Sequence, residues 1–180
     1  MLVWRVTRKA HAERPMSGEG ARRYGGRWNY IGVAVVYTSQ SLSLAVLEYL
    51  VNLSITDLPD DLVSVQIEIP EDTPRTEIAI KDLPDNWRTF PSVELKDIGT
   101  EWARQETVPI LVVPSVVIPT EFNYLVNPTH PSSHGIKILS LDPFALDTRL
   151  YSTRKPAQKR SRKVHSCSLS PLYRVTRSRL

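Results

Sequence analysis

Two residues in the first third of the sequence have surroundings that suggest chemistry. Arg27 follows two glycines in segment 25–29, where the backbone can approach a ligand and the guanidinium offers a planar fork of donors for a phosphate or a ribose. Glu48 is the only charged residue in the apolar segment 42–51. A buried carboxylate needs a partner or a cleft, so it is a candidate for function. Each also has a plainer interpretation, a solvated turn arginine and the polar stripe of a surface helix.

Two further residues carry groups that could bind a ligand. Tyr37 ends a stretch typical of a strand, where it is either a core aromatic or a stacking platform. Ser115 lies in an apolar run bounded by Pro114 and Pro119, and a buried hydroxyl there needs a hydrogen-bond partner. No Gly-x-Ser-x-Gly motif surrounds Ser115, which argues against a hydrolase nucleophile.

Three familiar sites are excluded by spacing. Segment 18–23 begins like Gly-x-Gly-x-x-Gly, but Arg23 stands at the last glycine position and no strand leads directly into it. A Walker A motif is absent. His130 and His134 are four residues apart, but Pro131 would break a helix that aligned them, so we expect no metal site.

The elements that must position these residues follow from local pattern. Apolar and alternating stretches predict strands at 2–6, 33–37, 62–69, 108–113, 115–118 and 135–141, and helices at 42–51 and 93–105. Residues 9–29 read as an irregular, glycine-rich loop. Several short strands without regular alternation of strand and helix indicate an α+β fold.

Charge and composition limit the function classes. Residues 151–180 hold nine of the 23 basic residues and no acidic ones, so residues 1–150 keep 14 basic and 19 acidic residues, a net charge of −5. An acidic body argues against direct DNA binding by the folded domain. The basic tail, 151–180, lacks apolar periodicity and is predicted to be disordered. No apolar run is long enough for a membrane span, the N-terminus has no signal-peptide pattern and the single cysteine forms no internal disulfide, so we expect a cytoplasmic protein.

The order and spacing of the unusual residues resemble the RES family, which is named for an arginine, a glutamate and a serine. Here these would be Arg27, Glu48 and Ser115, with Tyr37 as the aromatic partner. The resemblance extends from residue 2 to about residue 150, so we assign 1–150 to a RES domain. The motifs that carry it are Gly18-x-Gly20-Ala21, Gly25-Gly26-Arg27-Trp28-Asn29, Val36-Tyr37, Leu44-Ala45-x-Leu47-Glu48, Val113-Pro114-Ser115 and Asn123-Tyr124-Leu125-x-Asn127-Pro128-x-His130-Pro131.

The resemblance implies a fold, an activity and a partner. RES proteins are similar to ADP-ribosyltransferase toxins, with a split β-sheet core, a few helices and a cleft for NAD⁺. They are toxins of two-gene toxin–antitoxin pairs whose antitoxin carries an Xre-like helix-turn-helix domain, and the resemblance allows a homodimer within that complex. Members degrade NAD⁺ by hydrolysis or phosphorolysis, and some transfer ADP-ribose to a protein.

The resemblance also implies roles for individual residues. Glu48 would stabilise the oxocarbenium ion that develops when the nicotinamide–ribose bond breaks. Tyr37 would stack on the nicotinamide and Arg27 would bind the ribose or the pyrophosphate, and these three form the predicted catalytic set. Ser115, Trp28 and Asn123 complete the predicted substrate-binding residues, in addition to Arg27 and Tyr37.

NAD⁺ is then the substrate, and neither a metal nor a permanently bound cofactor is expected. Two alternatives stay open: an ADP-ribosyltransferase that modifies a protein, and an RNA-binding module that acts through the basic tail.

Overall fold

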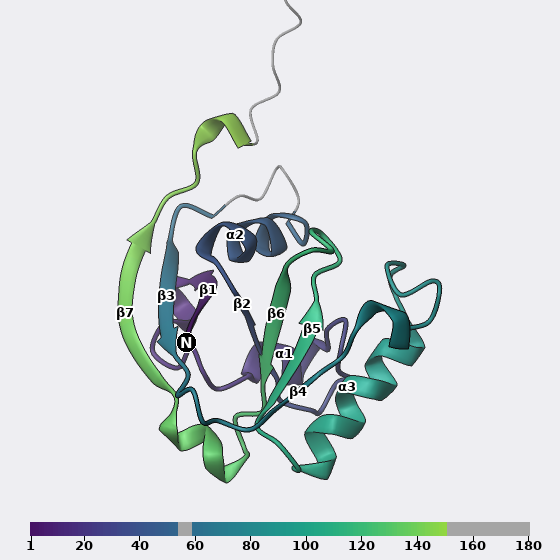
Figure 1. Cartoon of the computed structure of the whole chain (residues 1–180). Coiled ribbons are helices and arrows are strands. Elements are labelled where there is room, and N and C mark those ends of the chain that lie inside the picture. Colours follow the sequence, from purple (N-terminus) through teal and green to yellow (C-terminus); the bar gives the residue numbers. More distant parts are fainter. Residues whose placement is uncertain (54–58, 151–180) are drawn as a thin grey trace, which may run out of the picture. The chain divides into compact units, whose positions relative to one another are not determined.

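Seven strands form one mixed sheet in the order β4-β5-β6-β2-β1-β3-β7 (Figure 1). The β4–β5 pair is parallel and the other pairs are antiparallel. The strands are β1 (Leu2–Arg8), β2 (Val36–Ser39), β3 (Leu62–Glu68), β4 (Arg75–Glu77), β5 (Ile110–Pro114), β6 (Phe122–Val126) and β7 (Lys137–Phe144). Within residues 1–53 and 59–150, three α-helices accompany them: α1 (Glu19–Tyr24), α2 (Leu42–Leu50) and α3 (Val93–Gln105). Short 3-10 helices are η1 (Lys9–His11), η3 (Ile80–Asp82), η4 (Pro131–Gly135) and η5 (Thr148–Leu150).

The computed structural model describes residues 1–53 and 59–150. The chain divides into the unit Met1–Asp147 and a second unit, Thr148–Leu180, of which η5 is the described part. The predicted disorder of the tail, 151–180, lies outside the described residues. In the part of the chain that is described, no helix has the length and apolar character that crossing a membrane requires.

The sheet is nearly divided between β1 and β2, which share the single register pair Trp4–Ser39. One buried cluster joins Val3 of β1 and Val65 of β3 to Ile110 of β5 and Val126 of β6. Strands that lie on opposite sides of β2 can share a core only if the sheet bends, so its two halves face one another. The predicted α+β class with a split sheet is confirmed.

Both longer helices begin at a serine cap. The Ser41 side chain accepts from the Leu44 amide at 3.2 Å at the start of α2, and the Ser92 side chain accepts from the Leu95 amide at 3.3 Å at the start of α3. Such caps satisfy amides that have no partner within the helix.

Each helix then covers its own part of the sheet. Ala45 and Val46 of α2 pack against Val6 of β1 and Leu62 of β3. The α3 residues Leu95, Trp102 and Ala103 share a core cluster with Leu111, Val113 and Leu125 of β5 and β6. Residue Tyr37 of β2 packs on that second cluster. Helices α2 and α3 therefore cover different core clusters, and Tyr37 of β2 contacts the cluster covered by α3.

Local structure departs from the sequence predictions in several places, and the last strand, expected at 135–141, is Lys137–Phe144. Residues 9–29 were expected to be irregular but contain η1 and α1, and β2 begins at Val36 rather than at 33. Strands β4 and β6 were not predicted. The strand expected at 115–118 is a turn, because the Ser115 hydroxyl accepts from the amides of Val117 and Ile118 at 3.1 and 3.0 Å and competes with strand pairing.

Candidate active site

The Glu48 carboxylate is held by two donors from the neighbouring strands. Its Oε1 accepts from the Ser115 hydroxyl at 2.7 Å and from the Asn123 side-chain amide at 2.6 Å. The Ser39 hydroxyl donates to Asn123 Oδ1 at 2.7 Å, which fixes the amide so that its nitrogen faces Glu48. Among the described residues, Oε2 has no hydrogen-bond donor. One oxygen of this half-buried carboxylate is held by two donors, whereas the other has none among the described residues.

Strand register explains why these residues meet. Ser39 of β2 pairs with Asn123 of β6, and Asn123 pairs in turn with Val113 of β5, two residues before Ser115. Residues paired across antiparallel strands point to the same face, as do residues two apart along a strand. Three polar side chains therefore lie together where α2 brings Glu48.

The Ser115 hydroxyl positions its neighbours and has no base that would activate it as a nucleophile among its described hydrogen-bond partners, apart from the Glu48 carboxylate that it holds. Its side chain is completely buried, and its hydroxyl donates to Glu48 while it accepts from two backbone amides in the following turn. All the hydrogen-bonding capacity of a serine hydroxyl is used in this arrangement. Ser115 therefore holds the carboxylate and the turn in place together.

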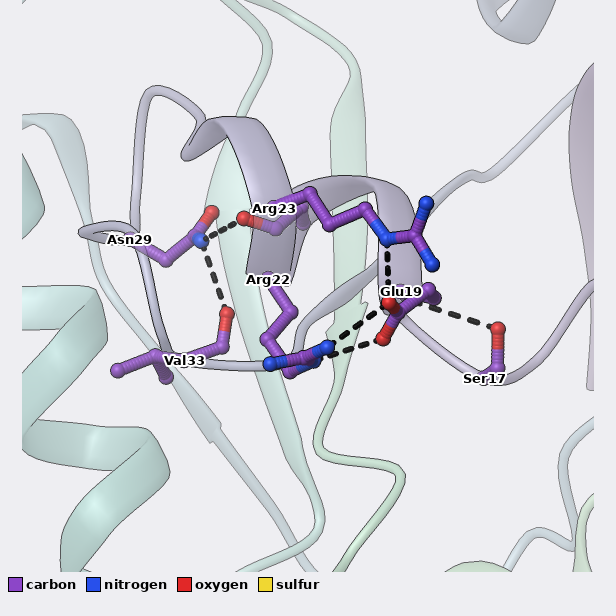
Figure 2. A network of polar contacts seen from close by, with 7 residues as sticks. Ser17, Glu19, Arg22, Arg23, Asn29 and Val33 are labelled. Atoms are coloured by element: carbon purple, nitrogen blue, oxygen red, sulfur yellow. Dashed lines mark hydrogen bonds and ion pairs between the residues drawn. The ribbon is translucent and has the colours of Figure 1, made fainter.

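The second half of the site is the glycine-rich segment that carries Arg27. The Tyr37 hydroxyl donates to Asn29 Oδ1 at 2.7 Å and accepts from the Trp28 amide at 3.0 Å. The Asn29 side-chain nitrogen donates to the carbonyls of Ala21 and Val33 at 2.8 and 3.0 Å, a network that Figure 2 shows beside α1. Burial raises the pKa of Tyr37, and the Trp28 amide and Arg27 oppose this shift, so the hydroxyl stays protonated and can keep donating.

Close backbone contacts hold the same segment against its surroundings. A Cβ added to Gly26 would lie 2.5 Å from the Tyr37 hydroxyl oxygen and 2.8 Å from Asn29 Oδ1. A Cβ added to Gly99 of α3 would collide with the carbonyl oxygen of Trp28. Glycine at these two positions is required because no side chain fits.

Arg27 emerges half-buried from this segment. Its Nη1 donates to the carbonyls of Thr89 and Trp87 at 2.8 and 3.5 Å, and its guanidinium carbon lies 5.2 Å from the centre of the Phe90 ring. Burial lowers the pKa of Arg27, whereas the Glu48 carboxylate and Tyr37 act in the opposite direction. The Glu48 carboxylate therefore favours the charged form of Arg27, although no ion pair joins the two residues in the described part of the chain.

The other arginines near the loop are engaged elsewhere. Arg22 and Arg23 both donate to the Glu19 carboxylate, at 2.7 and 2.5 Å for their Nε atoms (Figure 2). These two hydrogen bonds lower the pKa of Glu19 to about 2. The basic pair is thus compensated within α1, whereas Arg27 is the one basic residue of segment 25–29.

The predicted residues therefore fall into two groups that β2 links. Glu48, Ser115 and Asn123 form one hydrogen-bonded cluster. Tyr37, two residues before Ser39 on β2, binds the segment that carries Arg27 through the Trp28 amide. The Trp28 ring is 3% exposed and belongs to the core, so its predicted contact with substrate stays a prediction.

Three residues of the site were missed from the sequence. Ser39 and Asn29 orient Asn123 and Tyr37 through their side chains. Arg5 of β1 donates from Nη1 to the Tyr37 carbonyl at 3.0 Å, and its buried Nε has no partner among the described residues. Asn29 lies within the motif at 25–29, so the sequence contained a signal for it. The roles of Arg5 and Ser39 depend on strand pairing, which no local pattern reveals.

Comparison with known proteins shows the family of this chain. The model of the RES domain family matches residues 2–148. The chain belongs to the RES domain family. A relative from Sphingobium sp. (strain YBL2), "Prs ADP-ribosylating toxin", is 38% identical over 152 residues, which cover 82% of this chain and 94% of the relative. A "Toxin Res" of Yersinia enterocolitica is 40% identical over 153 residues, 83% of this chain and 99% of the relative.

The fold of this RES domain also has a solved counterpart. A chain in the crystal structure of the M. tuberculosis MbcT–MbcA toxin–antitoxin complex matches with a TM-score of 0.65 at 16% sequence identity. The match covers 83% of this chain and 86% of that one. The match confirms the predicted α+β fold.

Proposed function

We propose that this RES protein is a toxin of a toxin–antitoxin system that cleaves the nicotinamide–ribose bond of NAD⁺. The observation that carries the proposal is the Glu48 carboxylate, whose Oε1 is fixed by Ser115 and Asn123 while Oε2 is left for a ligand. Bond cleavage releases neutral nicotinamide from a cationic ring and leaves positive charge on the ribose. A preorganised carboxylate stabilises that charge as it forms.

The remaining residues suit the rest of the substrate. Arg27 supplies donors and positive charge for the pyrophosphate or a ribose, within electrostatic reach of Glu48. The Tyr37 ring provides an aromatic surface for the nicotinamide, while its hydroxyl holds the loop. Water or phosphate then attacks the ribose carbon, giving ADP-ribose or its phosphorylated form.

A second candidate reaction is transfer of ADP-ribose to a protein. It is favoured by the name of the Sphingobium relative, "Prs ADP-ribosylating toxin". The same Glu48 and Arg27 would act, with an acceptor side chain in place of water or phosphate. The two reactions share the bond that breaks and differ in what receives the ribose.

The test is to incubate the purified protein with NAD⁺ alone, with added phosphate, and with a cell lysate, and to measure free nicotinamide and labelled protein. Release of nicotinamide without a protein acceptor is the expected result. Nicotinamide release that depends on lysate and accompanies labelled protein would favour the transferase. No release under any of the three conditions would contradict both.

We further propose that an antitoxin with an Xre-like helix-turn-helix domain binds this chain. Support comes from the structural counterpart, which was solved in a toxin–antitoxin complex. The test is co-expression with the product of the adjacent gene, which should form a stable complex and restore growth. If the product of that gene does not copurify with this chain, the proposed antitoxin partner would be contradicted.

A further inference from the structure

Segment 84–91 carries an aromatic ring that the reaction above does not use. Phe90 is 66% exposed, and its ring lies 5.2 Å from the guanidinium carbon of Arg27. Isolated exposed apolar residues are common and need no explanation by themselves. Phe90 differs from them because its neighbour is Arg27, the cation that we propose for the pyrophosphate or a ribose.

The segment around Phe90 is fixed to both halves of the site. Arg27 donates to the carbonyls of Trp87 and Thr89, and Arg88 donates from Nη2 to the carbonyl of Val116 at 3.2 Å. Val116 belongs to the turn whose next two amides hold the Ser115 hydroxyl. The segment therefore connects the Arg27 loop with the turn that positions Glu48.

The same segment is anchored in the protein core and at the start of α3. Trp87 is 7% exposed and shares the core cluster of Trp28 and Trp102. The Thr89 amide and hydroxyl both donate to the carbonyl of Asn86 at 2.8 Å, which closes a tight turn. Two residues after Phe90, Ser92 caps α3. Little conformational entropy would then be lost when a ligand ring packs on Phe90.

We infer that Phe90 is the stacking surface for the adenine base of the dinucleotide, an inference that rests on the proposed function. In NAD⁺ the pyrophosphate separates the nicotinamide ribose from the adenosine. If the nicotinamide ribose lies at Glu48 and the pyrophosphate at Arg27, the Phe90 ring, which packs on Arg27, lies beside the adenosine half of NAD⁺. Arginine and a base can share one aromatic residue, because both stack on its π-face.

The stacking assignment predicts a selective loss. Phe90→Ala should raise KM for NAD⁺ about tenfold, as expected for the loss of one base–aromatic contact, and leave kcat unchanged. KM for nicotinamide mononucleotide, which lacks adenosine, should not change. Phe90→Trp should restore KM for NAD⁺. Val93→Ala is the matched control, because Val93 is 61% exposed at the start of α3 and should alter neither substrate.

Binding of ADP-ribose, measured by calorimetry on the same variants, separates this inference from the proposed function. Phe90→Ala should weaken it about tenfold. Three results would overturn the role of Phe90. The first is a Phe90→Ala variant with unchanged KM for NAD⁺ and unchanged affinity for ADP-ribose. The others are equal rises in KM for NAD⁺ and nicotinamide mononucleotide, and a wild-type protein that does not bind ADP-ribose. Wild-type protein that binds ADP-ribose through Phe90 but releases no nicotinamide would overturn the proposed reaction and leave the stacking site standing.

Discussion

At the scale of single residues, the site separates groups that act on a ligand from groups that hold them. Ser115 and Asn123 donate to Glu48, and Ser39 orients Asn123. Asn29 does the same for the Tyr37 hydroxyl. The sequence motif contains residues of both kinds, and its spacing alone does not tell them apart.

Tyr37 can be divided experimentally into its ring and its hydroxyl. Tyr37→Phe removes a donor to Asn29 and leaves the Trp28 amide without its acceptor, so we expect a loss of about 1–3 kcal/mol in the free energy of unfolding. The ring remains, so KM for NAD⁺ should change far less than in Tyr37→Ala. Chemical denaturation and nicotinamide release measure the two effects. Equal losses of affinity in both variants would contradict the stacking role.

The raised pKa of Tyr37 also gives a dependence of stability on pH. Above the ordinary tyrosine pKa of about 10, the unfolded chain loses this proton while the folded chain keeps it, so the stability contribution falls as pH rises. Between pH 9 and pH 11 wild type should therefore lose more stability than Tyr37→Phe, by denaturant titration at each pH. Parallel curves would show that Tyr37 does not titrate differently on folding.

At the scale of elements, prediction succeeded where one local pattern determined the structure. Helix α3 was predicted at its observed bounds, 93–105, and α2 within one residue, and a serine caps the start of each helix. Ser115 broke the expected strand because its hydroxyl captured two amides. Strand β6 went unpredicted, although it supplies Asn123, since its pairing with β2 and β5 is a long-range property.

The glycine-rich segment offers an internal comparison between two glycines. Gly26→Ala places a Cβ 2.5 Å from the Tyr37 hydroxyl oxygen, so it should displace Tyr37 or the loop and lower both the melting temperature and kcat/KM. Gly20→Ala in α1 meets nothing within 4 Å and should stabilise the helix by roughly 0.5–1 kcal/mol. Thermal melts and nicotinamide release on both variants test the difference. Comparable behaviour of the two variants would contradict the close fit of Gly26.

At the scale of the whole molecule, the described body contains both groups of the proposed site. The family model ends at residue 148, close to the end of the unit Met1–Asp147. Residues 1–150 carry a net charge of −5, and the excess of basic residues lies in 151–180. An RNA-binding function would therefore depend on the tail, whereas NAD⁺ cleavage would not.

Removing residues 151–180 separates those two functions. A chain that ends at Leu150 should keep the melting temperature and the nicotinamide release of the full chain, because the groups assigned to catalysis all precede residue 124. Growth arrest on expression should persist as well. Loss of toxicity with intact folding would favour the RNA-binding alternative.

The most direct test of the account is Glu48→Gln. Glutamine preserves the size of the side chain and an oxygen that can accept from Ser115 and Asn123, but it removes the charge that would stabilise the oxocarbenium ion. Nicotinamide release should therefore fall about 10²–10³-fold, while NAD⁺ affinity and melting temperature stay close to those of wild type. A Glu48→Gln protein that folds normally and releases nicotinamide within a few-fold of the wild-type rate would contradict the assignment of Glu48 as the catalytic carboxylate.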